Sequence, residues 1–186
     1  LGDALMSERK AEIMRAIHPR NTERTVRAAR LLDLPFMCCH TPADNSVNKF
    51  LQAQCDELGD DATVDDLLDM LKAIPEYREA VLQGNGPVIF EGSKDRRTGK
   101  IMVDMTGGTS GPPTSIEKLA GAGVGTIVGM HMNEEHRKKA KAEHMNVVIA
   151  GHVSSDSIGM NLIIDKFQQE GVQVVECSGF TRVSRA

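Results

Sequence analysis

The stretch from Val124 to His152 reads VGTIVGMHMNEEHRKKAKAEHMNVVIAGH and decides the fold class. Two short apolar runs, 125–129 and 146–150, lie on either side of a charged segment, 133–144, whose length suits a helix. A strand, a helix and a second strand in this order are typical of a right-handed crossover unit, which places the two strands parallel in one sheet. We therefore expect an α/β protein.

The same alternation continues on both sides of this stretch. Short apolar runs bounded by turn residues suit buried strands, and the longer amphipathic stretches between them suit helices. Further strands are expected at 88–91, 101–105 and 172–177, with helices at 115–121 and 155–170. This order predicts an α/β fold with a mostly parallel or mixed sheet and flanking helices.

The N-terminal half has a more helical pattern. The apolar run from Leu34 to Cys39 has the length of a buried strand, which would make the adjacent thiols of Cys38 and Cys39 inert. We divide the chain into 1–84, a helical segment plus this strand, and 85–186, the alternating β/α segment. Helices are expected at 4–17, 23–32, 47–58 and, in two pieces opened by Thr63 and Pro75, within 60–83.

Composition excludes several classes of protein. The 186 residues are 40% hydrophobic and 26% charged, which is ordinary for a folded globular chain. A net charge of −4 argues against a nucleic-acid partner or an anionic membrane surface. No apolar run approaches the roughly 20 residues that span a bilayer. The four cysteines include no CxxC pair, so we expect neither a disulfide framework nor a zinc ribbon, and we predict a cytoplasmic protein.

The first candidate site motif is HTPAD, from His40 to Asp44. It follows the expected strand 34–39 and precedes a helix, and ligands of open α/β sheets bind beyond the carboxyl ends of the strands. Imidazole and carboxylate groups there could hold a metal. The structural alternative is that Asp44 or Ser46 caps the following helix and that His40 is an ordinary polar residue at a strand end.

The second motif is GHVSSD, which places His152 and Asp156 after the apolar run 146–150. If 152–156 form a first helical turn, both side chains lie on one face of the helix. The alternative is that Ser154 or Ser155 is an N-cap and that Asp156 only interacts with the helix dipole. Together the two motifs could supply a cleft with four ligands and no thiolate, which suits Zn, Mn, Fe or Mg.

Two further features are weaker evidence for a functional site. His131 follows the expected strand 125–129 and could reach the same cleft, whereas we assign His136 to a solvated helical turn. The Gly-rich loop at 106–114 could cradle a phosphate of a nucleotide through backbone N–H groups. It lacks the spacing of the known phosphate-binding loops and contains two prolines, so a connector or lid is the simpler interpretation.

The two His–Asp motifs resemble those of the NIF-three-like dinuclear metal-centre proteins, many of them labelled GTP cyclohydrolase type 2 homologues. That family carries HT-x-x-D and, near its C-terminus, GH-x-x-(S/T)-E, each after a strand. The resemblance covers roughly 30–60 and 120–178. Asp156 stands where Glu is usual, and the family's adjacent His-His pair is absent. Because the chain begins with Leu1, we expect it to be the C-terminal part of a longer member.

This resemblance implies that Asp44, His152 and Asp156 are metal ligands, with one aspartate able to bridge two divalent ions. His40 would orient a ligand, and His131 or His40 would be the catalytic acid–base group. The implied activity is that of a metal-dependent hydrolase acting on a small nucleotide or phosphoester, and the alternative is a non-catalytic ring-forming scaffold. The resemblance also implies a homo-oligomer, specifically a hexamer.

Overall fold

The computed structural model describes residues 2–17, 23–107 and 110–186. The chain divides into two compact units. The N-terminal unit contains the described residues of 1–39 and 109–112, and the α/β unit contains those of 40–108 and 113–186. Among the described residues, no helix is both long enough and apolar enough to cross a membrane.

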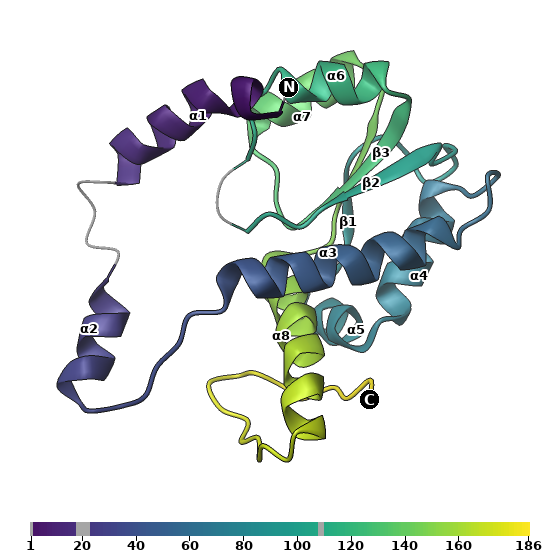
Figure 1. Cartoon of the computed structure of the whole chain (residues 1–186). Helices are drawn as coiled ribbons and strands as arrows, with labels where there is room; N and C mark the ends of the chain where they lie inside the picture. Colours follow the sequence, from purple (N-terminus) through teal and green to yellow (C-terminus); the bar gives the residue numbers. More distant parts are fainter. Residues whose placement is uncertain (1, 18–22, 108–109) are drawn as a thin grey trace. The chain divides into compact units, whose positions relative to one another are not determined.

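The N-terminal unit contains two helices, α1 (Gly2–Ile17) and α2 (Arg24–Leu31), at the predicted positions (Figure 1). The strand predicted from Leu34 to Cys39 is wrong. These residues have no regular secondary structure, and the side chains of Phe36, Met37 and Cys38 are exposed rather than buried. An apolar run becomes a strand only where a neighbouring strand accepts its backbone hydrogen bonds, and the sheet lies entirely in the other unit.

The α/β unit is built on a mixed sheet of β1 (Val88–Glu91), β2 (Lys100–Asp104), β3 (Val124–Gly129) and β4 (Asn146–Ile149). In the described chain these strands lie in the order β1-β4-β3-β2. The strands β2, β3 and β4 are parallel, and β1 pairs antiparallel with β4. The predicted α/β class and mixed sheet are therefore confirmed.

The strand predicted at 172–177 is also wrong. These residues are irregular and belong to a C-terminal tail that lies against α8 (His152–Gln169). Side-chain hydrogen bonds rather than a strand ladder hold this tail. In particular, Arg182 binds Asp165 of α8, and the backbone N–H of Val183 donates to Asn161.

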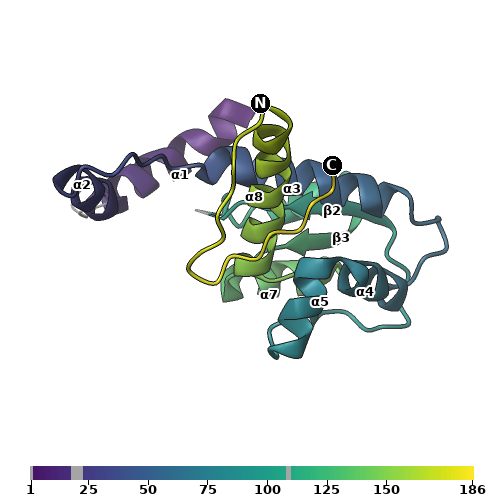
Figure 2. The ribbon, with the colours of Figure 1, turned by 90° about the horizontal axis from the view of Figure 1, so that it is seen from below.

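Helices cover both faces of the sheet (Figures 1 and 2). One face packs against α6 (Ser115–Gly121) and α7 (Glu134–Ala142). The other packs against α3 (His40–Asp56), α4 (Val64–Ala73), α5 (Pro75–Leu82) and α8. Successive strand residues face opposite layers, as the period of two requires. Val128 and Val148 enter the core beneath α3 and α8, and Ile127 and Val147 enter the core beneath α6 and α7.

Local sequence signals explain some of the helix boundaries. Thr63 forms a capping box with Asp66 at the start of α4, and Pro75 is the first residue of α5. The expected start of α3 at Val47 is wrong, because the helix begins at His40. Pro42 fits there, since the N–H that proline lacks has no partner in the first turn of a helix. The helix α8 likewise begins before residue 155, at His152.

Candidate metal centre

The two His–Asp motifs occupy equivalent places on two helices. His40 is the first residue of α3 and Asp44 lies one turn later, while His152 is the first residue of α8 and Asp156 lies one turn later. Residues four apart share a helix face. In each motif the imidazole Nε2 lies 3.6 Å from a carboxylate Oδ2. The predicted pairing within each motif is therefore present, and neither Asp44 nor Ser46 is an N-cap.

A close approach of α3 and α8 brings the motifs together. Gly159 of α8 faces the backbone of Ala43, and a Cβ placed on Gly159 would lie 2.4 Å from the Ala43 carbonyl oxygen. Only a glycine permits this contact, because any side chain would push the helices apart. Ala43 precedes Asp44, and Gly159 lies within one helical turn of Asp156. Figure 2 shows the two helices crossing beneath the sheet.

The carboxyl ends of the parallel strands supply the remaining groups. His131 follows β3, and its ring centroid lies 5.2 Å from that of His152, which follows β4. Gly107 follows β2, and its N–H donates to Oδ2 of Asp44 at 2.9 Å. The carbonyl oxygen of Gly107 lies 3.4 Å from Nε2 of His131.

Gly107 lies between the two motifs. A Cβ placed on it would lie 3.1 Å from Nε2 of both His40 and His152, and 3.4 Å from Oδ1 of Asp44. Three candidate ligand atoms from two helices therefore lie within 3.4 Å of one position, that of a Cβ on Gly107. We call His40, Asp44, His131, His152 and Asp156 the His/Asp cluster.

The electrostatics of the cluster favour a cation. Asp44 is only 8% exposed, and its Oδ1 is a buried atom without a hydrogen-bond partner among the described residues. An unpartnered buried carboxylate oxygen is costly unless a cation or water reaches it. Burial raises the pKa of Asp156, the imidazole of His152 opposes that shift, and the nearby charge of Asp44 raises the pKa further. A cation between the two carboxylates would relieve this repulsion.

The donor set has the right chemistry for a divalent metal, but the arrangement is not that of a closed site. Ligands about 2 Å from a tetrahedral ion are about 3.3 Å apart, and the separation within each motif is close to that value. Among the described residues, however, no three His, Cys, Asp or Glu side chains converge closely enough to hold an ion. Binding of an ion would require these side chains to move closer together.

The structure brings five of the histidines and aspartates considered in the sequence analysis together, but not His136. All five members of the His/Asp cluster lie at one end of the sheet, whereas His136 is buried on α7 beside Asn133. The assignment of His136 to a solvated turn is therefore wrong. Sequence reasoning missed Gly107, because the Gly-rich loop was interpreted as a connector or phosphate cradle. The available signal was its position after β2, whose carboxyl end lies at the same edge as those of β3 and β4.

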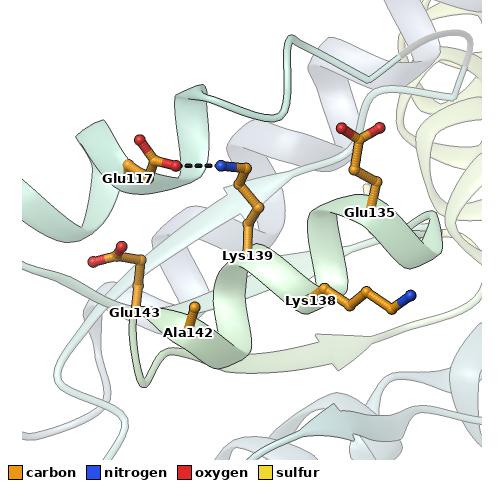
Figure 3. A pocket seen from close by; sticks show the side chains of 6 residues that line it. All are labelled: Glu117, Glu135, Lys138, Lys139, Ala142 and Glu143. Atoms are coloured by element: carbon orange, nitrogen blue, oxygen red, sulfur yellow. Dashed lines mark hydrogen bonds and ion pairs between the residues drawn. The ribbon is translucent and has the colours of Figure 1, made fainter.

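A separate hollow lies on the opposite helical layer, between α6 and α7 (Figure 3). Lys139 forms an ion pair there with Glu117, and Glu135 and Glu143 add acidic groups. The lining is thus a set of surface charges on two helices. It contains no member of the His/Asp cluster.

Comparison with known proteins agrees with this architecture. No protein-family model and no curated protein matches the sequence. A solved NIF3 superfamily protein from Sphaerobacter thermophilus is similar, with 30% sequence identity and a TM-score of 0.74. The similarity covers 95% of this chain and 65% of that protein, so the chain spans less than two thirds of its length. Reduced HcgD from Methanocaldococcus jannaschii is a weaker structural match, with 17% identity, a TM-score of 0.37, and coverage of 53% of this chain and 39% of HcgD.

Proposed function

We propose that this chain, whose fold is similar to that of a NIF3 superfamily protein over 95% of its length, binds a divalent metal ion at the His/Asp cluster and acts as a metal-dependent hydrolase. The observation that carries this proposal is the buried, unpartnered Oδ1 of Asp44, which lies with the Nε2 atoms of His40 and His152 within 3.4 Å of one position, that of a Cβ placed on Gly107. The substrate class that we propose is a small nucleotide or phosphoester. The chain spans 65% of the length of its solved relative, so any activity that belongs to the full length of such a protein is also only proposed for this chain.

The residues that would hold the ion are Asp44, His152 and Asp156. Carboxylate and imidazole ligands without thiolate suit Zn, Mn, Fe or Mg. Such an ion supplies a Lewis acid that polarises a phosphoryl oxygen and lowers the pKa of water. A second ion of a dinuclear centre would need ligands beyond these three, because the sequence has no adjacent histidine pair.

The remaining cluster residues are suited to substrate and proton handling. His40 and His152 have side chains that are 58% and 45% exposed, so solvent and a small substrate can reach the cluster. His131 lies against His152 on the exposed side, where its imidazole can accept a proton from a nucleophile or return one to a leaving group. His40 is the second candidate for that role. Asp44 is buried, so it would hold the ion rather than contact substrate.

Metal binding is the first test. Isothermal titration of the purified chain with MnCl₂ and with ZnCl₂ should give saturable binding. The variant Asp44→Asn should weaken it at least about a hundredfold, because it removes a ligand charge. Asp60→Asn, on an exposed turn, is the matched control and should bind as the unmodified chain does. An unmodified chain that binds neither ion would overturn the proposal.

Hydrolysis is the second test. With Mn²⁺ present, the chain should cleave a p-nitrophenyl phosphoester or a nucleoside triphosphate, and His131→Asn should lose this activity while retaining metal binding. Binding without turnover on any phosphoester or nucleotide would favour the alternative, a non-catalytic metal-binding scaffold. That alternative also predicts the ring-shaped homo-oligomer, which light scattering of the purified chain would detect with and without metal.

The cysteines support a proposal about the compartment. All four lie in the described residues as free thiols, and burial raises the pKa of Cys55 to about 12. Free exposed thiols such as Cys38 and Cys177 persist in reducing surroundings. We therefore propose a cytoplasmic location, which fractionation of expressing cells would test.

A further inference from the structure

Three side chains on one face of α3 hydrogen-bond to the edge strand β2 and its continuation. They are four residues apart along the helix. Each accepts one backbone N–H, and the three N–H groups belong to every second residue of the strand. The pairs are Val103 to Gln52 Oε1 at 2.9 Å, Met105 to Asn48 Oδ1 at 3.0 Å, and Gly107 to Asp44 Oδ2 at 2.9 Å. We call these three hydrogen bonds the α3 ladder.

The α3 ladder exists because two repeats nearly match. Four residues of an α-helix advance about 6 Å. Two residues of a strand advance about 6.6 Å, and outward-facing N–H groups of an edge strand recur at that interval. Gln52 also donates its Nε2 to the carbonyl oxygen of Ile101 at 3.2 Å. The helix therefore satisfies the backbone of the edge as another strand would, and α3 cannot slide along β2 without breaking all of these bonds.

The last hydrogen bond of the ladder acts on the proposed metal ligand. Gly107 engages Oδ2 of Asp44, which leaves Oδ1 as the oxygen without a partner. That same Oδ1 lies near the point around which Nε2 of His40 and Nε2 of His152 gather. The ladder thus sets both the position of the carboxylate along β2 and which of its oxygens is left without a hydrogen-bond partner.

We infer that Asn48, Gln52 and Gly107 are positioning residues that preset Asp44 for cation binding, an inference that rests on the proposed function. None of the three needs to touch the ion. Groups that orient a metal ligand typically contribute about 10- to 100-fold to metal affinity.

The surroundings of Gly107 favour a residue without a side chain. It is not among the described glycines with positive φ, so its backbone conformation does not by itself exclude alanine. The space is tight, because an added methyl group would lie 3.1 Å from the Nε2 atoms of His40 and His152, which would have to move by a few tenths of an ångström. A Gly107→Ala variant should therefore disturb the cluster while the fold persists.

The decisive experiment compares the same substitution on two faces of α3. Asn48→Leu removes an acceptor from the ladder, and Asn45→Leu makes the same change at an exposed position beside Asp44. Isothermal titration with MnCl₂ at 25 °C, on variants that are folded by circular dichroism, should show at least about tenfold weaker binding for Asn48→Leu only. Asn48→Asp keeps the acceptor oxygen and should restore affinity to near the unmodified value.

Other outcomes have separate meanings. If Asn48→Leu does not fold, Gly107→Ala carries the test. It should weaken Mn²⁺ binding at least about tenfold, whereas Gly121→Ala, which has open space around its Cβ position, should not. Unchanged affinity in Asn48→Leu, or in Gly107→Ala where that variant carries the test, would overturn this inference and leave the proposed function intact. An unmodified chain that binds no Mn²⁺ would overturn both.

Discussion

Gly159 of α8 lies directly against the backbone of Ala43 of α3, so closely that a Cβ would approach the Ala43 carbonyl oxygen to 2.4 Å. This contact holds the two helices that carry the His–Asp motifs at their crossing point. The cluster therefore depends on a glycine that carries no chemical group of its own.

Gly159→Ala should destabilise the protein, because the added methyl group meets backbone atoms that cannot rotate away. Overpacking of this kind costs about 1–3 kcal/mol, measurable by urea unfolding. Metal affinity should fall as well, since the motifs move apart. Gly121→Ala, at an open position in α6, is the control and should not lower stability. Equal stability of the two variants would contradict the role assigned to the crossing.

Arg185→Met should also lower stability strongly. Glu76 is buried, and its carboxylate accepts hydrogen bonds from Arg185 at 2.8 Å and from Asn161 at 3.0 Å. Removing the guanidinium leaves a buried charge without its counter-ion, which typically costs about 3–5 kcal/mol.

The double variant Glu76→Gln/Arg185→Met should recover much of that loss, because it removes both charges. Arg78→Met, on the exposed side of α5, is the matched control for the loss of an arginine. If Arg185→Met unfolds at the same urea concentration as Arg78→Met, the buried ion pair contributes no stability.

Asp165 should make the free energy of unfolding depend on pH in the acid range. Burial raises its pKa, but hydrogen bonds from Arg182 and from the N–H of Arg185 outweigh burial, so the pKa is lowered in the folded chain. The unfolded chain then takes up the proton first as the pH falls. The stabilisation is present above the ordinary pKa of about 4 and is lost as pH falls through the folded value.

Urea unfolding at a series of pH values from 7 to 3 checks this sign. The free energy of unfolding of Asp165→Asn should fall less steeply between about pH 5 and 3 than that of the unmodified chain. Asp60→Asn, at an exposed position, should keep the original slope. A slope unaffected by Asp165→Asn would mean that the tail contacts contribute nothing to the pH dependence.

Tyr77 should resist ionisation while the protein is folded. It is fully buried, and burial raises the pKa of its phenol more than the 2.8 Å hydrogen bond to Ser155 lowers it. The unfolded chain ionises near pH 10, so stability is present below that pH and is lost as the pH rises. Because the chain has one tyrosine and no tryptophan, absorbance at 295 nm follows this residue alone.

In an alkaline titration, the phenolate signal of the folded protein should appear together with the loss of circular dichroism. In concentrated urea it should appear near pH 10. A folded chain that titrates near pH 10 would show that Tyr77 is open to solvent.

Much of the α/β unit was predictable because its signals are local. The alternation around Val124–His152 gave the parallel strands β3 and β4, and Thr63 and Pro75 gave the starts of α4 and α5. The start of α3 was less predictable. The sequence predicts a helix from residue 47, whereas α3 begins at His40 and contains Pro42 in its first turn.

Two strand predictions failed for one reason. The runs 34–39 and 172–177 have the composition of strands, but a strand needs a partner that accepts its hydrogen bonds. The edge of β2 is instead occupied by the side chains of Asn48 and Gln52, and the C-terminal residues are held by Asp165 and Asn161. Composition does not show which groups will form hydrogen bonds with the backbone of a strand or of an apolar run.

By itself, the amino-acid order determined the spacing of His40 to Asp44 and of His152 to Asp156, because helical periodicity places residues four apart on one face. Only the tertiary structure decided that the two pairs meet, that the N–H of Gly107 takes one oxygen of Asp44, and that the other oxygen is left without a partner. Those facts depend on a helix crossing and on an edge strand from distant parts of the chain. Contacts of that kind arise from packing, which no local pattern encodes.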